Sequence, residues 1–108
     1  MRLSPLDPNK SYGLTLLGRA HVLCGNFNKA LPLIAESLRL RSNFRGALID
    51  STVAHALAGD LVSSRQSLAA YQKIVPEARL AQIMQWRHLS TEGRKIYLRG
   101  MRLAGLPE

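Results

Sequence analysis

Apolar residues recur at every third or fourth position along much of this chain, which is the spacing of one face of an α-helix. The first such segment spans residues 11–24 and the second spans residues 27–41, with Gly25 between them. In the first segment the positions on this spacing are Leu14, Leu17, Ala20 and, together with His21, Cys24. In the second they are Ala30, Ile34, Leu38 and, one turn on, Arg41. The pattern predicts two amphipathic helices joined by a tight turn, because glycine readily takes the left-handed conformation that ends a helix.

The same arrangement occurs a second time, with Gly59 in the place of Gly25. The equivalent pairs are Ala20/Ala54, His21/His55, Leu23/Leu57, Phe27/Leu61, Ala30/Ser64, Ile34/Leu68 and Leu40/Ile74, whereas Leu38 meets Gln72. A helix–turn–helix unit of this period, about 34 residues, is typical of the tetratricopeptide repeat. We therefore predict an all-α fold of about six helices in stacked antiparallel hairpins, with repeat one at about 11–44 and repeat two at about 45–78.

Local signals mark the ends of these helices. Asn26 and Asp60 follow the two glycines, and either side chain can accept hydrogen bonds from the N–H groups at a helix start. The last helix of repeat two is expected over residues 61–75 and should stop at Pro76, which cannot continue it.

Pro32 fits this scheme badly. It lies inside the predicted helix 27–41, where a proline costs about 3 kcal/mol. We expect the helix either to bend near residues 28–32 or to start late.

The regular repeat fades after Pro76. The segment 77–89 can form a third helix of the first type, and its apolar residues are Leu80, Ile83, Met84 and Trp86. Ser90 is a candidate N-cap for a last helix that reaches Ala104, with Glu92 in its first turn and Arg99 and Arg102 near its end, as the helix dipole favours. Gly105 and Pro107 follow. Since repeat arrays need an atypical helix to cover the last apolar face, residues 79–104 are expected to cap a single domain of 108 residues.

Composition narrows the setting of the protein. Fifteen Lys and Arg against seven Asp and Glu give a net charge of +8, which favours polyanions or an acidic protein surface as partners. No apolar run is long enough to span a membrane, and the first ten residues lack the apolar core of a secretory signal. The single cysteine, Cys24, cannot form an internal disulfide. We expect a cytoplasmic protein, with Cys24 as a small buried apolar residue.

Three stretches together carry a resemblance to a known family: RLSPLDP at residues 2–8, AHVLCGNFNKAL at 20–31 and YLRGMRLAGLPE at 97–108. They resemble the C-terminal tetratricopeptide region of bacterial adenylate and guanylate cyclases and of related winged-helix transcriptional regulators. The resemblance implies a regulatory part of a signalling protein in which another domain precedes the repeats. Ser42 stands where the family usually has proline, and Leu14 stands in the tryptophan position. No cyclase metal aspartate or recognition helix is present, so the chain is expected to be a C-terminal piece or a remnant, with Met1 a natural or a new start.

Catalytic chemistry finds no support in the sequence. The acids form no pair within helical reach, and no phosphate-binding glycine loop or Ser–His–Asp pattern occurs. His21 and His55 are equivalent, but stacked repeats would hold them about 8–10 Å apart, too far to share a zinc ion. We expect packing roles for both, no cofactor and no metal.

The first helices of such repeats line a concave face, which is the expected binding surface. Its candidate residues are Tyr12, Thr15, Arg19, Val22, Leu23, Gly46, Ile49, Asp50, Val53, Ala56, Ile83 and Arg87. This mainly apolar groove suits an amphipathic helix or apolar peptide. The same residues could instead cover one another or a missing neighbouring repeat.

Two basic clusters stand outside that groove, at Arg39, Arg41 and Arg45 and at Arg94, Lys95, Arg99 and Arg102. They are either solvated helix faces or docking sites for an acidic partner or phosphates, and no aromatic residues interleave with them for stacking on single strands. The leading hypothesis is a non-catalytic module for protein–protein contacts that self-associates in isolation. The alternative is a small basic nucleic-acid-binding protein.

Overall fold

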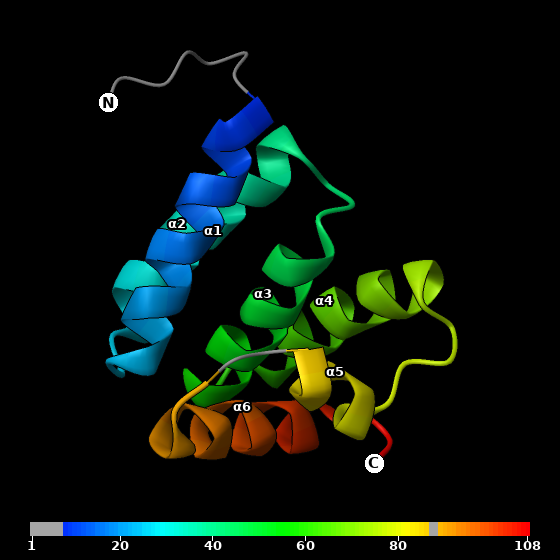
Figure 1. The fold of residues 1–108 in the computed structure, drawn as a ribbon. Helices are drawn as coiled ribbons and strands as arrows, with labels where there is room; N and C mark the ends of the chain where they lie inside the picture. Colours follow the sequence, from blue (N-terminus) through cyan, green and yellow to red (C-terminus); the bar gives the residue numbers. More distant parts are fainter. Residues whose placement is uncertain (1–7, 87–88) are drawn as a thin grey trace.

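The computed structural model of the chain describes residues 8–86 and 89–108 (Figure 1). Within these residues the fold is all-α, with six helices and no strand, as the sequence predicts. The helices are α1 (Pro8–Leu23), α2 (Phe27–Leu40), α3 (Arg45–Leu57), α4 (Leu61–Ile74), α5 (Leu80–Trp86) and α6 (Thr91–Ala104). The first motif of the family resemblance lies almost wholly outside the described residues.

The internal repeat of the sequence is also a repeat of the structure. The first hairpin, α1–α2, and the second hairpin, α3–α4, end their first helices at the equivalent Leu23 and Leu57. Both turns have a glycine with positive φ, 79° at Gly25 and 91° at Gly59, so the predicted helix stops are confirmed. Both turns also close with the same hydrogen bond, in which the residue after the glycine donates its N–H to a histidine carbonyl, at 2.8 Å to His21 and 2.9 Å to His55.

The expected side-chain caps form at two of three sites. The Asp60 carboxylate accepts a hydrogen bond from the Ser63 N–H at 3.1 Å, and the Ser90 hydroxyl accepts one from the Gly93 N–H at 3.1 Å. The Asn26 side chain makes no such bond, so this expectation is wrong there. Only its backbone carbonyl serves the helix start, accepting from the Ala30 N–H at 3.0 Å.

Pro32 lies on the exposed side of an unbroken α2. The expected late start is wrong, because α2 begins at Phe27 as α4 begins at the equivalent Leu61. A proline cannot donate to the carbonyl four residues earlier, which here belongs to the exposed Asn28. Water can therefore serve that carbonyl, and a bend remains the expected response.

The helix that continues the stack after α1 and α3 is α6. In the described part of the segment expected to do this, 77–89, the short α5 is the helix that forms. Arg19 on α1 contacts Asp50 on α3. Val53, which is the repeat equivalent of Arg19, lies on α3 and contacts Gly100 on α6. A methyl group at Gly100 would lie 3.0 Å from the Val53 Cα, so the glycine allows α6 to approach the backbone of α3. In Figure 1, α6 crosses the second hairpin and covers it.

One apolar core joins these layers. It contains residues of α1 to α6 and of the segment after α6, among them Val22, Ile34, Val53, Leu68, Ile83, Met101 and Leu106. None of the helices in the described part of the chain is both long and apolar enough to cross a membrane.

Candidate functional site

A buried ion pair ties three helices together at the centre of the stack. The Asp50 carboxylate on α3 is fully buried, and the Arg19 guanidinium on α1 approaches it at 3.1 Å. The Tyr97 hydroxyl on α6 donates to the same carboxylate, at 2.7 Å to Oδ1. Burial alone lowers the pKa of Arg19, but the charge and hydrogen bond of Asp50 offset this and raise it above its usual value. The cluster therefore acts as a structural link, with each group turned toward the others.

Most of the predicted groove is not open in this chain. Five candidates expected to be exposed are buried: Thr15, Val22, Ile49, Val53 and Ile83. Asp50 and Ala56, expected on the same face, are buried as well. The expectation of an exposed concave face is wrong at these positions, because consecutive helices of the stack pack directly on them. Arg19 is only partly exposed, and Arg87 lies outside the described residues.

Among the groove candidates that the structure describes, Tyr12 is the one that is largely exposed, at 54%. Its ring stacks on Phe44, with centroids 6.3 Å apart and planes 9° apart. The Arg41 guanidinium lies 4.7 Å from the Phe44 centroid on the loop that joins the hairpins. Arg41, a member of the first basic cluster, thus lies against the Phe44 ring rather than extending into solvent.

The inner side of α1 is lined by hydroxyl groups. Ser11 and Thr15 are buried against Ser37 of α2. The Ser37 Oγ lies 2.9 Å from the Ser11 Oγ and 2.7 Å from the Thr15 Oγ1. Ser37 also donates to the Ser11 carbonyl at 2.8 Å. These small polar side chains satisfy one another, so hydrogen bonds join the first hairpin in addition to its apolar contacts, such as that of Ile34 with Gly18.

The outer face of α1 is apolar as a consequence. We define it by Tyr12, Leu16, Leu17 and Ala20, with Cys24 just beyond the helix end. Leu16 is 42% exposed and Leu17 is 52% exposed. The sequence predicts an apolar face on this helix. Three of its residues, Leu17, Ala20 and Cys24, lie at the surface.

The predictions for the cysteine and the histidines have different outcomes. Cys24 is exposed, so its expected burial is wrong: it follows the last turn of α1 on the outer side. His21 and His55 are half-buried in equivalent places, next to the turns. The His55 Nδ1 lies 3.8 Å from the Asp60 carboxylate, too far for a hydrogen bond. Among the described residues no three His, Cys, Asp or Glu side chains gather as metal ligands would.

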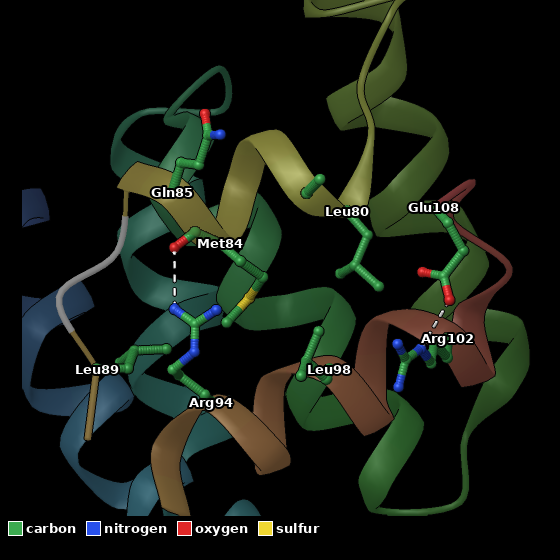
Figure 2. A pocket seen from close by; sticks show the side chains of 9 residues that line it. Leu80, Met84, Gln85, Leu89, Arg94, Leu98, Arg102 and Glu108 are labelled. Atoms are coloured by element: carbon green, nitrogen blue, oxygen red, sulfur yellow. Dashed lines mark hydrogen bonds and ion pairs between the residues drawn. The ribbon is translucent and has the colours of Figure 1, made fainter. Parts of the chain in front are cut away.

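A hollow of about 680 Å³ lies between α5 and α6, as Figure 2 shows. Its lining is mixed: Leu80, Met84 and Leu98 are apolar, and the polar residues are Gln85, Arg94, Arg102 and Glu108. Arg102 is paired with the Glu108 carboxylate at 3.0 Å, and Arg94 donates to the Met84 carbonyl at 3.4 Å. The chain's own groups therefore already engage both guanidiniums of this hollow.

The remaining basic residues are partly neutralised by nearby acids. Arg39 pairs with Glu36 on α2, and Lys95 pairs with Glu92 on α6 at 3.4 Å. These pairs are solvent-exposed and contribute little to stability. Within the described part of the chain, neither Arg94 nor Arg99 of the α6 cluster pairs with an acid, and Arg94 donates instead to the Met84 carbonyl. The outward side of α6 is therefore charged, in contrast to the outer face of α1.

The geometry defines a class: an all-α protein of two equivalent helical hairpins with a covering helix. No model of a known protein family matches the chain, and no curated protein or solved structure is significantly similar to it.

The sequence reasoning missed Leu16 as a surface residue and placed Leu17 in the apolar face. A usable indication was present, since α1 carries leucines at positions 14, 16 and 17, on different sides of the helix, and serines and a threonine at 11 and 15. A helix with such a polar stripe and apolar residues elsewhere has two faces that need a partner.

Proposed function

We infer that the protein is a non-catalytic module for protein–protein contacts, a tetratricopeptide-like scaffold or regulatory element that acts in the cytoplasm. Its binding surface is the outer face of α1, rather than the concave groove expected from the repeat pattern. The partner is a helix or hairpin with a complementary apolar stripe. The family resemblance agrees with such a role, in which the chain is the C-terminal part or a remnant of a bacterial signalling protein.

One observation carries this proposal: α1 turns Leu16 and Leu17 outward and the hydroxyls of Ser11 and Thr15 inward. Burying the exposed part of a leucine side chain contributes about 1 kcal/mol, so Leu16 and Leu17 together offer a substantial gain to a partner that covers them. Exposed leucines are common one by one, but a cluster along a single helix is typical of an interaction site.

The two ends of the stack also differ in a way that supports the proposal. At the C-terminal end α6 presents Arg94, Lys95, Arg99 and Arg102, which suits a terminal helix facing water. At the N-terminal end α1 presents an apolar face. The N-terminal end is the more apolar of the two, although Leu103 on α6 is also 43% exposed, and this end is suited to contact another helical element.

The alternative, nucleic-acid binding, depends on the net charge of +8 and on the α6 cluster. Pairing of Lys95 with Glu92 and of Arg102 with Glu108 weakens that cluster as a phosphate-binding surface. The apolar outer face of α1 has no role in this alternative, which is why we favour a protein partner.

A photo-crosslinking amino acid at position 17 tests the proposal in the cell that makes the protein. The matched control is position 62 on α4, because Val62 is 69% exposed but lies away from α1. We expect protein adducts from position 17 and few from position 62. Adducts absent at position 17, or equal at both positions, would overturn the assignment.

A further inference from the structure

Two adjoining hollows lie where the turn of the first hairpin meets the end of α3 and the side of α6. The larger, of about 430 Å³, is lined by residues 25–29 of the first turn and by Ala58 on the second turn. The smaller, of about 210 Å³, lies between the second turn and α6. Phe27 belongs to both linings, so the two hollows form one surface, which we call the turn groove. It is built from other residues than those that define the outer face of α1.

The smaller hollow has an apolar floor. Phe27, Leu57 and Ile96 are partly buried against the core, and Leu103 beside them is 43% exposed. Sites for small molecules and cofactors commonly have volumes of about 300–1,000 Å³, and this hollow is smaller. A single large apolar side chain is the group that suits such a space. Side chains of this kind, placed in a pocket at the centre of a contact, anchor many protein–protein interfaces.

The turn groove also carries two cations. Lys29 lines the larger hollow and Arg99 lines the smaller one, and no acid is among the described residues that line either. Within residues 8–86 and 89–108, neither cation has an ion pair or a hydrogen bond. The carboxylate of Asp60, the residue after Gly59, is already engaged by the Ser63 N–H at 3.1 Å. The positive charge of the groove is therefore left for a partner to neutralise.

The two repeats differ at this place, which explains why the charge is concentrated there. The start of α4 has Asp60 as its cap and Ser63 as the donor to it, whereas the start of α2 has the uncharged Asn26 and Lys29 at the equivalent positions. The first turn thus has a cation where the second turn has a neutral hydroxyl, and an amide where the second has a carboxylate.

We propose that the turn groove binds an acidic peptide segment of a partner protein. The segment places one large apolar side chain in the smaller hollow and its carboxylates beside Lys29 and Arg99. This site is additional to the outer face of α1 and does not depend on it. The net charge of +8 attracts an acidic segment, and the apolar floor gives a peptide an anchor that a phosphate backbone lacks. Because both cations are exposed, we expect weak binding that salt reduces further.

A titration followed by amide NMR spectra of the isotope-labelled chain tests the site. The probe is a short synthetic peptide in which Leu-Phe stands between two Asp-Glu pairs. At about 150 mM salt, where long-range attraction is screened, we expect a Kd on the order of 1 mM or below, with the largest shifts at Gly25, Phe27, Gly59 and Arg99. The same peptide with Ala-Ala in place of Leu-Phe keeps the charges and should bind at least about tenfold more weakly.

Two pairs of variants separate this site from general charge attraction. Arg99→Glu should raise Kd at least about tenfold, whereas Lys73→Glu, the same change at the far end of α4, should alter it less than about twofold. Leu103→Ala should weaken binding, and Val62→Ala, at a residue that is 69% exposed on α4, should not. All four positions are exposed, so the melting temperatures of the variants should stay close to that of the native chain.

Several results would overturn the proposal. They are the absence of shifts at about 2 mM peptide, shifts outside the turn groove, equal affinity for the Leu-Phe and Ala-Ala peptides, and equal effects of Arg99→Glu and Lys73→Glu. An oligothymidylate that binds the groove as tightly as the Leu-Phe peptide would also overturn it, because the groove would then recognise charge alone. The photo-crosslinking experiment at position 17 reports on the outer face of α1, so either proposal can fail without the other.

Discussion

Replacing Tyr97 with phenylalanine removes one hydroxyl from the cluster that joins α1, α3 and α6. Both Tyr97 and Asp50 are fully buried, and the hydroxyl donates to the Asp50 carboxylate at 2.7 Å. The phenyl ring keeps its packing, so the loss is confined to the polar interactions of the hydroxyl with Asp50 and Arg19. A bond to a charged group contributes about 1.5–3 kcal/mol, and we expect Tyr97→Phe to lower the free energy of unfolding by about 2 kcal/mol.

Urea denaturation followed by circular dichroism measures this loss directly. The midpoint should fall with an unchanged m-value, because the exposed surface of the unfolded chain is the same. For a chain of 108 residues the melting temperature should fall by about 9 °C. The matched control is Tyr12→Phe, which removes a hydroxyl from a ring that is 54% exposed and should change stability by less than about 0.5 kcal/mol.

The double mutant isolates the Tyr97–Asp50 interaction. In an Asp50→Asn background the hydroxyl faces a neutral amide, so Tyr97→Phe should cost less than half of its value in the native chain. Equal losses for Tyr97→Phe and Tyr12→Phe would refute the cluster as a link between the helices. An undiminished loss in the Asp50→Asn background would refute the carboxylate as the acceptor that matters.

Three further predictions test the turns, the α3–α6 contact and the charge. Asp60→Ala should lower the melting temperature more than the equivalent Asn26→Ala, because only Asp60 caps its helix through its side chain, and equal shifts would contradict this. Hydrogen bonds from Ser63 hold the pKa of Asp60 below its ordinary value, so the stabilisation is present at neutral pH, and thermal melts should show it lost as the pH falls below about 4. Gly100→Ala should cost about 1–3 kcal/mol in urea melts, since its methyl would press on the Val53 backbone, and a variant as stable as the native chain would contradict that contact. Fluorescence anisotropy with nonspecific DNA at about 50 mM salt should show no binding, and tight binding that weakens steeply with salt would favour the nucleic-acid alternative.

Helix positions followed closely from the sequence because they depend on local signals. The glycines at 25 and 59 have the positive φ that the turn requires, and the equivalent helices α2 and α4 start at the predicted residues. The cap at Ser90 formed as well. These features are set by neighbouring residues, so a single sequence was enough to predict them.

The orientation of α1 could not be predicted in the same way. Periodicity identified Leu17, Ala20 and Cys24 as one stripe, but which stripe faces inward depends on what α2 presents. Ser37 presents a hydroxyl and a carbonyl that pair with Ser11 and Thr15, so the polar side is buried. Such a long-range match is visible only once the hairpin has closed.

The role of α6 was missed for a similar reason. The helical pattern of 77–89 suggested a third stacking helix, but α5 ends at Trp86 and the stack continues with α6. The deciding contacts, Gly100 on Val53 and Tyr97 on Asp50, join residues 47 apart in sequence, which no local pattern encodes.

The central claim is that α1 buries its hydroxyl side and exposes its leucine side, and thiol labelling tests it most directly. Thr15→Cys and Leu17→Cys, each in a Cys24→Ser background, are labelled at nanomolar concentration. We predict that the thiol at position 17 reacts nearly as fast as in the unfolded chain and that the thiol at position 15 reacts at least about 100-fold more slowly. Equal rates, or faster labelling at position 15, would contradict the account.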